Sequence, residues 1–145
     1  MNIDIRNYDS ITDEAFLIAT WIKSNRSSPA TRAVPTPIYL IGQRYRIMKC
    51  LKAESTRILV ACDSDESNLI YGYAVWGVPS ILHYVYVKKA YRGAGVAKAL
   101  LEQPQGTAVL YTHRSPEIWV ERLLRDKYIN YVYNPYLLEE QNANN

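Results

Sequence analysis

The chain has 145 residues, 48% hydrophobic and 21% charged, which is ordinary for one globular domain and argues against a disordered chain. Its net charge of +3 suits a small anionic ligand and lacks the heavy basic footprint of a nucleic-acid binder. The start carries no basic-then-apolar signal segment, and no apolar run approaches the roughly 18 residues of a membrane helix, so we expect a cytosolic protein without a membrane partner.

The first predicted elements are a strand and a helix. Residues 2–8 alternate around two isoleucines, as a half-buried strand does. Residues 10–25, SITDEAFLIATWIKSN, predict a helix that Ser10 or Thr12 caps.

A loop with three prolines then spans residues 26–37. It is interpreted either as a mobile lid or as a plain connector. A second helix is predicted over about residues 38–51, with an irregular apolar stripe formed by Tyr39, Ile41 or Gly42, Tyr45 and Met48.

Three strands follow. Residues 56–62 and 69–77 flank the turn DSDESN and predict an antiparallel hairpin. Residues 81–88 are apolar on both faces, which indicates a central, doubly covered strand.

The remaining elements alternate. A helix is predicted from about Gly95 to Gln103, a strand over 107–112, a helix over 115–127 and a strand over 128–134. The order is β-α-α-β-β-β-α-β-α-β, which predicts an α+β fold with a mixed, mostly antiparallel central sheet flanked by helices. We expect a single domain over residues 1–138 and a polar tail, EEQNANN, over residues 139–145.

The cysteines and histidines are few and scattered. Cys50 and Cys62 do not form a disulfide framework, and we expect both to be reduced and buried. Two cysteines and two histidines without ligand spacing predict no metal site.

The stretch VYVKKAYRGAGVAKALL, residues 85–101, carries the strongest chemical signal. Gly93 and Gly95 permit positive φ and close approach, and successive turn amides before a helix form an anion site. Lys88, Lys89 and Arg92 add positive charge. These features predict a phosphate ligand, yet the spacing fits neither a Walker A loop nor a dinucleotide fingerprint.

The element RGAGVA, residues 92–97, follows a strand that ends in valine and four linker residues, and precedes a leucine-rich helix. In this position it resembles the phosphate-binding motif of the GNAT superfamily of N-acetyltransferases, and the element order extends the resemblance over almost the whole chain. The segment LHYVYVKKAYRGAGVAKALL is also similar to small acetyltransferase-like proteins of bacteriophages, which implies a location in the host cytoplasm.

The resemblance implies acetyl-CoA as cosubstrate. Its pyrophosphate would lie on the amides of the glycine turn, with Arg92 and Lys98 nearby. Its pantetheine arm would pair with the backbone of the central strand. The implied binding residues are Val85, Tyr86, Val87, Arg92, Gly93, Ala94, Gly95, Val96, Ala97, Lys98 and His113.

His83 is the best candidate for the base that deprotonates the acceptor amine, because its ordinary pKa near 6.5 suits that work. Arylalkylamine N-acetyltransferases, which this segment resembles, carry a proton-relay histidine at this strand position. The alternative is a core histidine bonded to backbone or to a tyrosine.

The general acid is left open. The family often uses a tyrosine in its fourth helix, where this chain has Trp119 and Val120. The fallback candidates, each interpreted as structural before catalytic, are Tyr84, Tyr86, Tyr111 and Tyr128.

The acceptor is expected to be a primary amine on a small molecule or a protein. By analogy with the fold, its pocket would involve Trp21, Ser24, Tyr39, Arg44 and Tyr133. Two other functions stay open: a non-catalytic member that binds CoA or a partner protein, and a nucleic-acid binder that uses the basic turn. The family also implies a possible homodimer through the last strands.

Overall fold

The computed structural model describes residues 1–26, 28–29, 31–78, 80–102, 109–112 and 131–134. The predicted fourth helix, residues 115–127, therefore lies outside the described residues, as do His113, Tyr128 and the polar tail.

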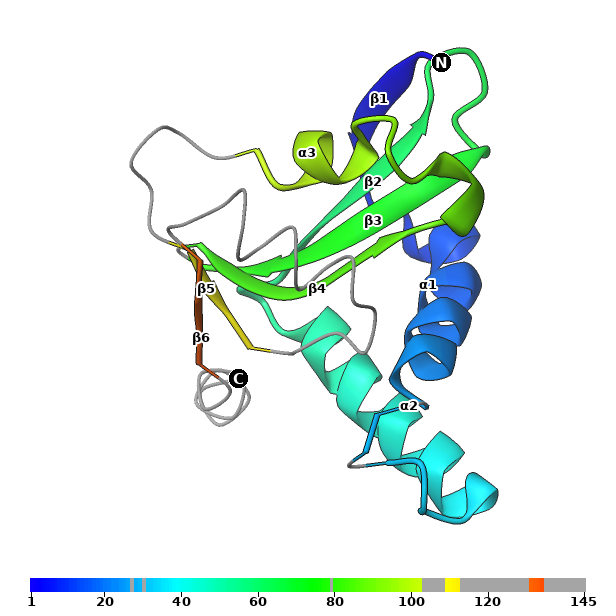
Figure 1. The fold of residues 1–145 in the computed structure, drawn as a ribbon, viewed down its shortest axis with the longest axis vertical. Coiled ribbons are helices and arrows are strands. Elements are labelled where there is room, and N and C mark those ends of the chain that lie inside the picture. The colour runs from blue at the N-terminus through cyan, green and yellow to red at the C-terminus, as the bar shows by residue number, and fades with distance from the viewer. Residues whose placement is uncertain (27, 30, 79, 103–108, 113–130, 135–145) are drawn as a thin grey trace.

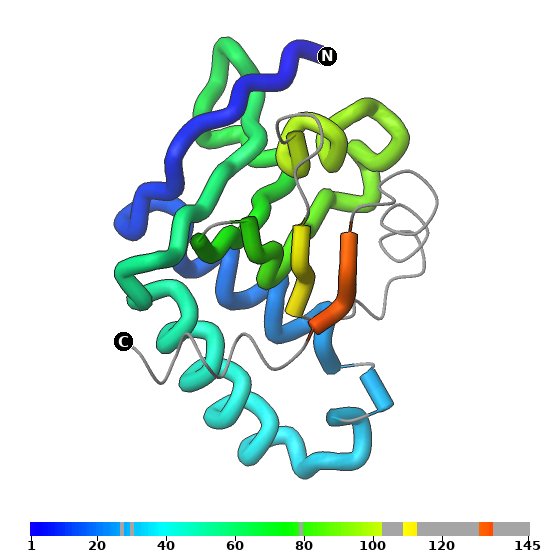
Figure 2. The backbone as a smooth tube through the Cα atoms, turned by 90° about the vertical axis from the view of Figure 1, so that its left-hand side faces the viewer, coloured from blue at the N-terminus to red at the C-terminus, as the bar shows by residue number. Residues whose placement is uncertain are grey.

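Six strands of the described residues form one sheet in sequence order: β1 (Ile3–Asn7), β2 (Arg57–Asp63), β3 (Ile70–Gly77), β4 (Ile81–Val87), β5 (Val109–Tyr111) and β6 (Tyr131–Tyr133). The first four strands pair antiparallel, whereas β4 with β5 and β5 with β6 pair parallel. Figure 2 shows β5 and β6 side by side in yellow and orange. The predicted mixed, mostly antiparallel sheet and the predicted hairpin are confirmed.

The helices cover both faces of this sheet. They are α1 (Ser10–Asn25), α2 (Thr36–Lys52) and the five-residue α3 (Val96–Leu100), preceded by the short 3-10 turn η1 (Lys89–Tyr91). Figure 1 shows α1 and α2 on one side and α3 on the other. One core cluster accordingly joins both long helices to the sheet, and a second joins α3 to the opposite face.

The cap of α1 differs from the prediction. Asp9, not Ser10 or Thr12, is the N-cap, and its Oδ1 accepts a hydrogen bond from the Ile11 amide at 2.9 Å. A carboxylate suits this place because it also interacts favourably with the positive end of the helix dipole.

The predicted stripe on α2 is wrong in part. Tyr39 is buried as expected, but Ile41 and Tyr45 are exposed, and Ile47 and Cys50 are buried in their place. The helix has apolar residues around much of its circumference, so periodicity alone does not select the packed face.

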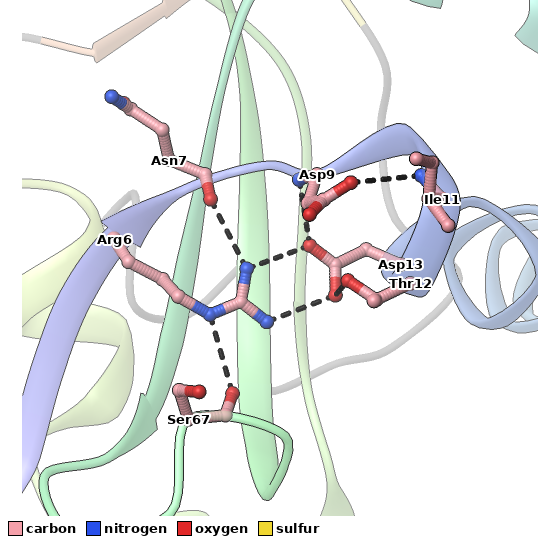
Figure 3. Close-up of polar contacts among 7 residues, drawn as sticks. All are labelled: Arg6, Asn7, Asp9, Ile11, Thr12, Asp13 and Ser67. Atoms are coloured by element: carbon pink, nitrogen blue, oxygen red, sulfur yellow. Dashed lines mark hydrogen bonds and ion pairs between the residues drawn. The ribbon is translucent and has the colours of Figure 1, made fainter.

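A partly buried ion pair fixes β1 to α1 (Figure 3). The Arg6 guanidinium donates to both carboxylate oxygens of Asp13, at 2.7 and 2.9 Å, and to the Ser67 carbonyl at 3.2 Å. Asp13 is only 2% exposed and also accepts from the Asp9 amide at 2.8 Å. The first helix is thus anchored to the strand before it and to the turn between β2 and β3.

Cys50 and Cys62 are free and buried, as expected.

Candidate cofactor and acyl-transfer site

Among the described residues, β5 pairs with β4 only at the start of β4. Ile81 pairs with Leu110 and Leu82 with Tyr111, and the Thr112 amide donates to the Leu82 carbonyl at 3.0 Å. Figure 1 shows β5 beside the first part of β4. Beyond Leu82, no strand among the described residues pairs with this side of β4.

The backbone of β4 presents polar groups along that open side. The Lys88 amide donates to the Tyr71 carbonyl of β3, and this register repeats at every second residue. In an antiparallel pair the alternate residues direct their amides and carbonyls to the other edge, and here these residues are Val85 and Val87. Nε of Arg92 donates to the Val87 carbonyl at 3.1 Å, which agrees with this orientation. The stretch can therefore pair with an extended polar chain.

A β-bulge interrupts β4 at His83. Trp76 lies opposite Leu82 and Val75 lies opposite Tyr84, so the register shifts by one residue between them. As a result Leu82 and Val85 face the same core cluster although they are three residues apart. Bulges of this kind re-aim side chains beside functional sites.

The bulge places His83 against the end of β5. The side chain is 1% exposed, and its Nδ1 lies 2.9 Å from Oγ1 of the buried Thr112. If the threonine oxygen accepts from Nδ1–H, the lone pair of the neutral ring is on Nε2, where a base needs it. Thr112 is a functional candidate that sequence analysis missed, since nothing in the sequence links His83 to a threonine 29 residues later, after the neighbouring strand.

The glycine turn has the backbone geometry that its sequence predicted. Gly93 and Gly95 have φ of +82° and +90°, both are exposed, and a Cβ at either position would meet nothing within 4 Å. The glycines are thus required by conformation rather than by space. Val96, Ala97 and Lys98 form the first turn of α3, where the amides have no acceptor inside the helix.

The predicted binding residues of this turn fall into two groups. The side chains of Ala94 and Lys98 are exposed, whereas Val96 is 1% exposed and anchors α3 in the core. Arg92 is half-buried because its guanidinium turns back toward the end of β4.

The part of β4 between the bulge and the glycine turn is short: four residue steps from His83 to Val87 span about 13 Å. The open edge of β4 therefore links the bulge to the glycine turn.

On the opposite face, α1 contacts the residue after His83. The Trp21 ring stacks on Tyr84 with centroids 4.6 Å apart and an interplanar angle of 8°, and Ser24 is hydrogen-bonded to the Tyr84 hydroxyl. Trp21 and Ser24, two predicted acceptor residues, are thus brought together.

The other acceptor candidates are more dispersed. Tyr39 donates to the Ile22 carbonyl and lies under the Arg26 guanidinium, 4.5 Å from its ring centroid. Arg44 is exposed on α2. Tyr133 packs against Tyr111, with their ring centroids 5.4 Å apart.

The tyrosines proposed as general acids have structural contacts. The Tyr84 hydroxyl is engaged by Ser24, the half-buried Tyr86 packs edge-on against Phe16, and Tyr111 lies against Tyr133. Tyr128 lies outside the described residues.

The described residues show neither a metal-binding cluster nor a membrane-spanning helix. They contain no group of three or more histidine, cysteine, aspartate or glutamate side chains that could hold a metal ion. No helix among them is long and apolar enough to cross a membrane.

The chain is similar to several solved structures, two of them described as acetyltransferases. A proposed acetyl transferase from Pyrococcus furiosus superposes with a TM-score of 0.66 at 12% identity, over 88% of this chain and 93% of that one. A Corynebacterium glutamicum protein described as histone acetyltransferase HPA2 and related acetyltransferase gives 0.55 at 20% identity, over 70% and 68%. The apo form of YjaB from Escherichia coli gives 0.50 at 17%, over 70% and 63%.

No protein-family model and no curated protein sequence matches the chain. The structural likeness establishes the fold: this chain has the α+β fold of the GNAT acetyltransferases, as its sequence predicted.

Proposed function

We propose that this protein is an acetyl-CoA-dependent N-acetyltransferase that acts on a primary amine of a small molecule or a protein. The observation that carries the proposal is the open edge of β4, which runs from the buried His83 to the positive-φ turn at Gly93 and Gly95. The strand edge suits the pantetheine arm of acetyl-CoA, the amide-rich turn suits its pyrophosphate, and the histidine suits the chemistry at its thioester.

Different residues of the chain would bind different parts of acetyl-CoA. The amides from Gly93 to Lys98 would hold the pyrophosphate, and exposed Lys98 adds a positive charge. The backbone of Val85 and Val87 would pair with the pantetheine amides, so these side chains need only be apolar. His113, the remaining predicted contact, lies outside the described residues.

In the reaction, the acceptor nitrogen bonds to the acetyl carbon, the carbon–sulfur bond breaks, and the amine loses one proton while the thiolate of CoA gains one. Alignment of amine and thioester supplies much of the rate. We propose that His83 takes the amine proton through Nε2 while Thr112 holds Nδ1. Thr112 acts through His83 and is therefore a positioning residue.

We also propose a homodimer formed through β6, the last described strand of the sheet. Val132 is 55% exposed there, an apolar side chain on an edge strand that a second copy would cover. Sedimentation velocity of wild type and Val132→Lys tests this: a dimer that the substitution dissociates supports it, and a monomeric wild type contradicts it.

The proposed function is tested by calorimetric titration with acetyl-CoA and CoA of the wild type, Gly95→Asp and Gly95→Asn. Asparagine and aspartate tolerate positive φ better than other side chains, so the two variants share one backbone and differ by one charge. We expect binding to the wild type, weaker binding to Gly95→Asn and none to Gly95→Asp.

Turnover is then measured as CoA release with a panel of amines. Binding without turnover on any amine would favour the non-catalytic alternative. A wild type that binds neither acetyl-CoA nor CoA would overturn the proposed function.

A further inference from the structure

The charges of the chain are unevenly distributed. All 14 acidic residues lie outside residues 15–53, although this stretch holds seven of the 17 basic residues. None of the seven lies within ion-pair distance of a carboxylate that the structure describes. They are Lys23, Arg26, Arg32, Arg44, Arg46, Lys49 and Lys52. The segment from mid-α1 to the end of α2 is therefore a positive surface without internal neutralisation.

The side of α2 that faces away from the sheet is also apolar. Residues 38, 41, 45, 49 and 52 recur at steps of three and four and so share one helix face. Ile38, Ile41 and Tyr45 on this face are 63%, 74% and 65% exposed, and Nζ of Lys49 lies 6.0 Å from the Tyr45 ring centroid. We refer to Ile38, Ile41, Tyr45, Lys49 and Lys52 as the outer face of α2.

The outer face belongs to the helix pair that packs on the sheet face carrying Tyr84. Tyr39 of α2 donates to the Ile22 carbonyl in α1. In the same turn of α1, Trp21 and Ser24 contact Tyr84, the neighbour of His83 at the bulge. A polypeptide lying on α2 would thus occupy the helix that packs against α1, and α1 in turn contacts the strand of the proposed base.

The positive charge and the exposed apolar side chains of the outer face of α2 indicate which class of partner it binds. Two α2 helices packed together would bring Arg44, Arg46 and both lysines of each helix face to face without a single carboxylate, so a symmetric contact between copies is repelled. Nucleic acid would use the cations but gain little from Ile38 and Ile41. An apolar centre with a charged rim is the pattern of a protein–protein interface.

We propose that the outer face of α2 binds an acidic polypeptide segment with apolar side chains, and that this segment carries the acceptor amine. The first half, docking, is independent of catalysis. The second half rests on the proposed acetyl transfer and identifies its acceptor class as protein amines in acidic surroundings.

The test measures docking by fluorescence anisotropy with three labelled peptides of equal length. The first combines leucine and glutamate with one lysine, the second replaces glutamate by lysine, and the third replaces leucine by serine. We expect only the first to bind well, and its binding to weaken as salt rises from about 0.05 M to about 0.5 M.

Variants of the full chain locate the contact. Ile38→Ser with Ile41→Ser removes apolar surface that is already exposed, and Lys49→Glu reverses one charge. Each should weaken binding of the first peptide about tenfold. Arg57→Glu, the same charge reversal at an exposed site on β2 outside the basic stretch, should leave it within about twofold. Circular dichroism verifies that each variant is folded.

The acceptor half is tested by mass spectrometry of the peptide lysine after incubation with acetyl-CoA. Acetylation of the first peptide at a rate about tenfold above the second supports it. If acetyl-CoA binds but the leucine–glutamate peptide does not, the inference is overturned and the proposed function stands. An RNA oligonucleotide or an anionic vesicle that binds as tightly as the first peptide, unaffected by the Ile38 and Ile41 changes, also overturns it.

Discussion

Nδ1 of His83 and Oγ1 of Thr112 lie 2.9 Å apart in a buried environment, one on the bulge of β4 and the other directly after β5. This contact joins the two strands at the point where they cease to pair. When the threonine oxygen accepts from Nδ1–H, the proton-accepting nitrogen of the neutral ring is Nε2.

Removing the threonine hydroxyl should slow catalysis without unfolding the protein. We expect Thr112→Val, which preserves shape, to lower kcat about tenfold with little change in KM for acetyl-CoA, because the ring loses its orientation. Thr112→Ser retains the hydroxyl and should recover most of the rate. A pH–rate profile identical in all three proteins would show that Thr112 does not position His83.

The glycine turn and helix α2 allow a matched comparison of backbone effects. Gly95→Ala forces a β-carbon into φ near +90° and should destabilise the protein by about 1–2 kcal/mol. Gly42→Ala, also in open space but inside α2, should stabilise it by up to about 1 kcal/mol. Urea denaturation measures the free energy of unfolding of both variants. Equal changes in the two would contradict the conclusion that the positive φ of Gly95 requires glycine.

The stability contributed by Asp13 should depend on pH. Burial raises the pKa of this carboxyl, but the hydrogen bonds from Arg6 and the Asp9 amide outweigh it and hold the pKa below its ordinary value. Its contribution is therefore complete above the unfolded pKa of about 3.9 and disappears as pH falls through the lower, folded pKa.

We expect Asp13→Asn to cost about 3 kcal/mol at neutral pH, because it leaves the Arg6 guanidinium without its carboxylate. The difference from wild type should shrink at acid pH, where the wild-type carboxyl is also neutral. Asp4→Asn, an exposed position on β1, serves as the control. An undiminished difference well below the folded pKa would contradict the linkage.

The Cys50 thiol should be inert in the folded protein. Burial raises its pKa to about 12, so at pH 8 about one molecule in ten thousand carries the thiolate. Iodoacetamide followed by peptide mass spectrometry should label Cys50 only after urea is added. Rapid labelling of the native protein at this residue would contradict its burial.

Local sequence signals were enough for the positions of most elements. The boundaries of α1 at Ser10 and Asn25 match the prediction because a polar start, an amphipathic middle and a following proline-rich loop all agree. The positive φ of Gly93 and Gly95 was likewise implied by a turn that only glycine suits. Helix α3 is shorter than predicted, ending at Leu100, although residues up to Gln103 favour a helix.

Long-range contacts were beyond the reach of the sequence. The bulge at His83 depends on the register between β3 and β4, and its contact with Thr112 depends on the crossover to β5. The outward position of Ile41 depends on which apolar residues of α2 the sheet selects. Each is decided by tertiary packing, which local periodicity does not encode.

The open side of β4 also bears on how the protein behaves without a ligand. Within the described residues it is a strand edge in the middle of a sheet, and such edges accept strands from other molecules. A ligand that pairs with this edge, as proposed for acetyl-CoA, would block such self-association. Purification in the presence of CoA should therefore favour a monodisperse sample at high concentration.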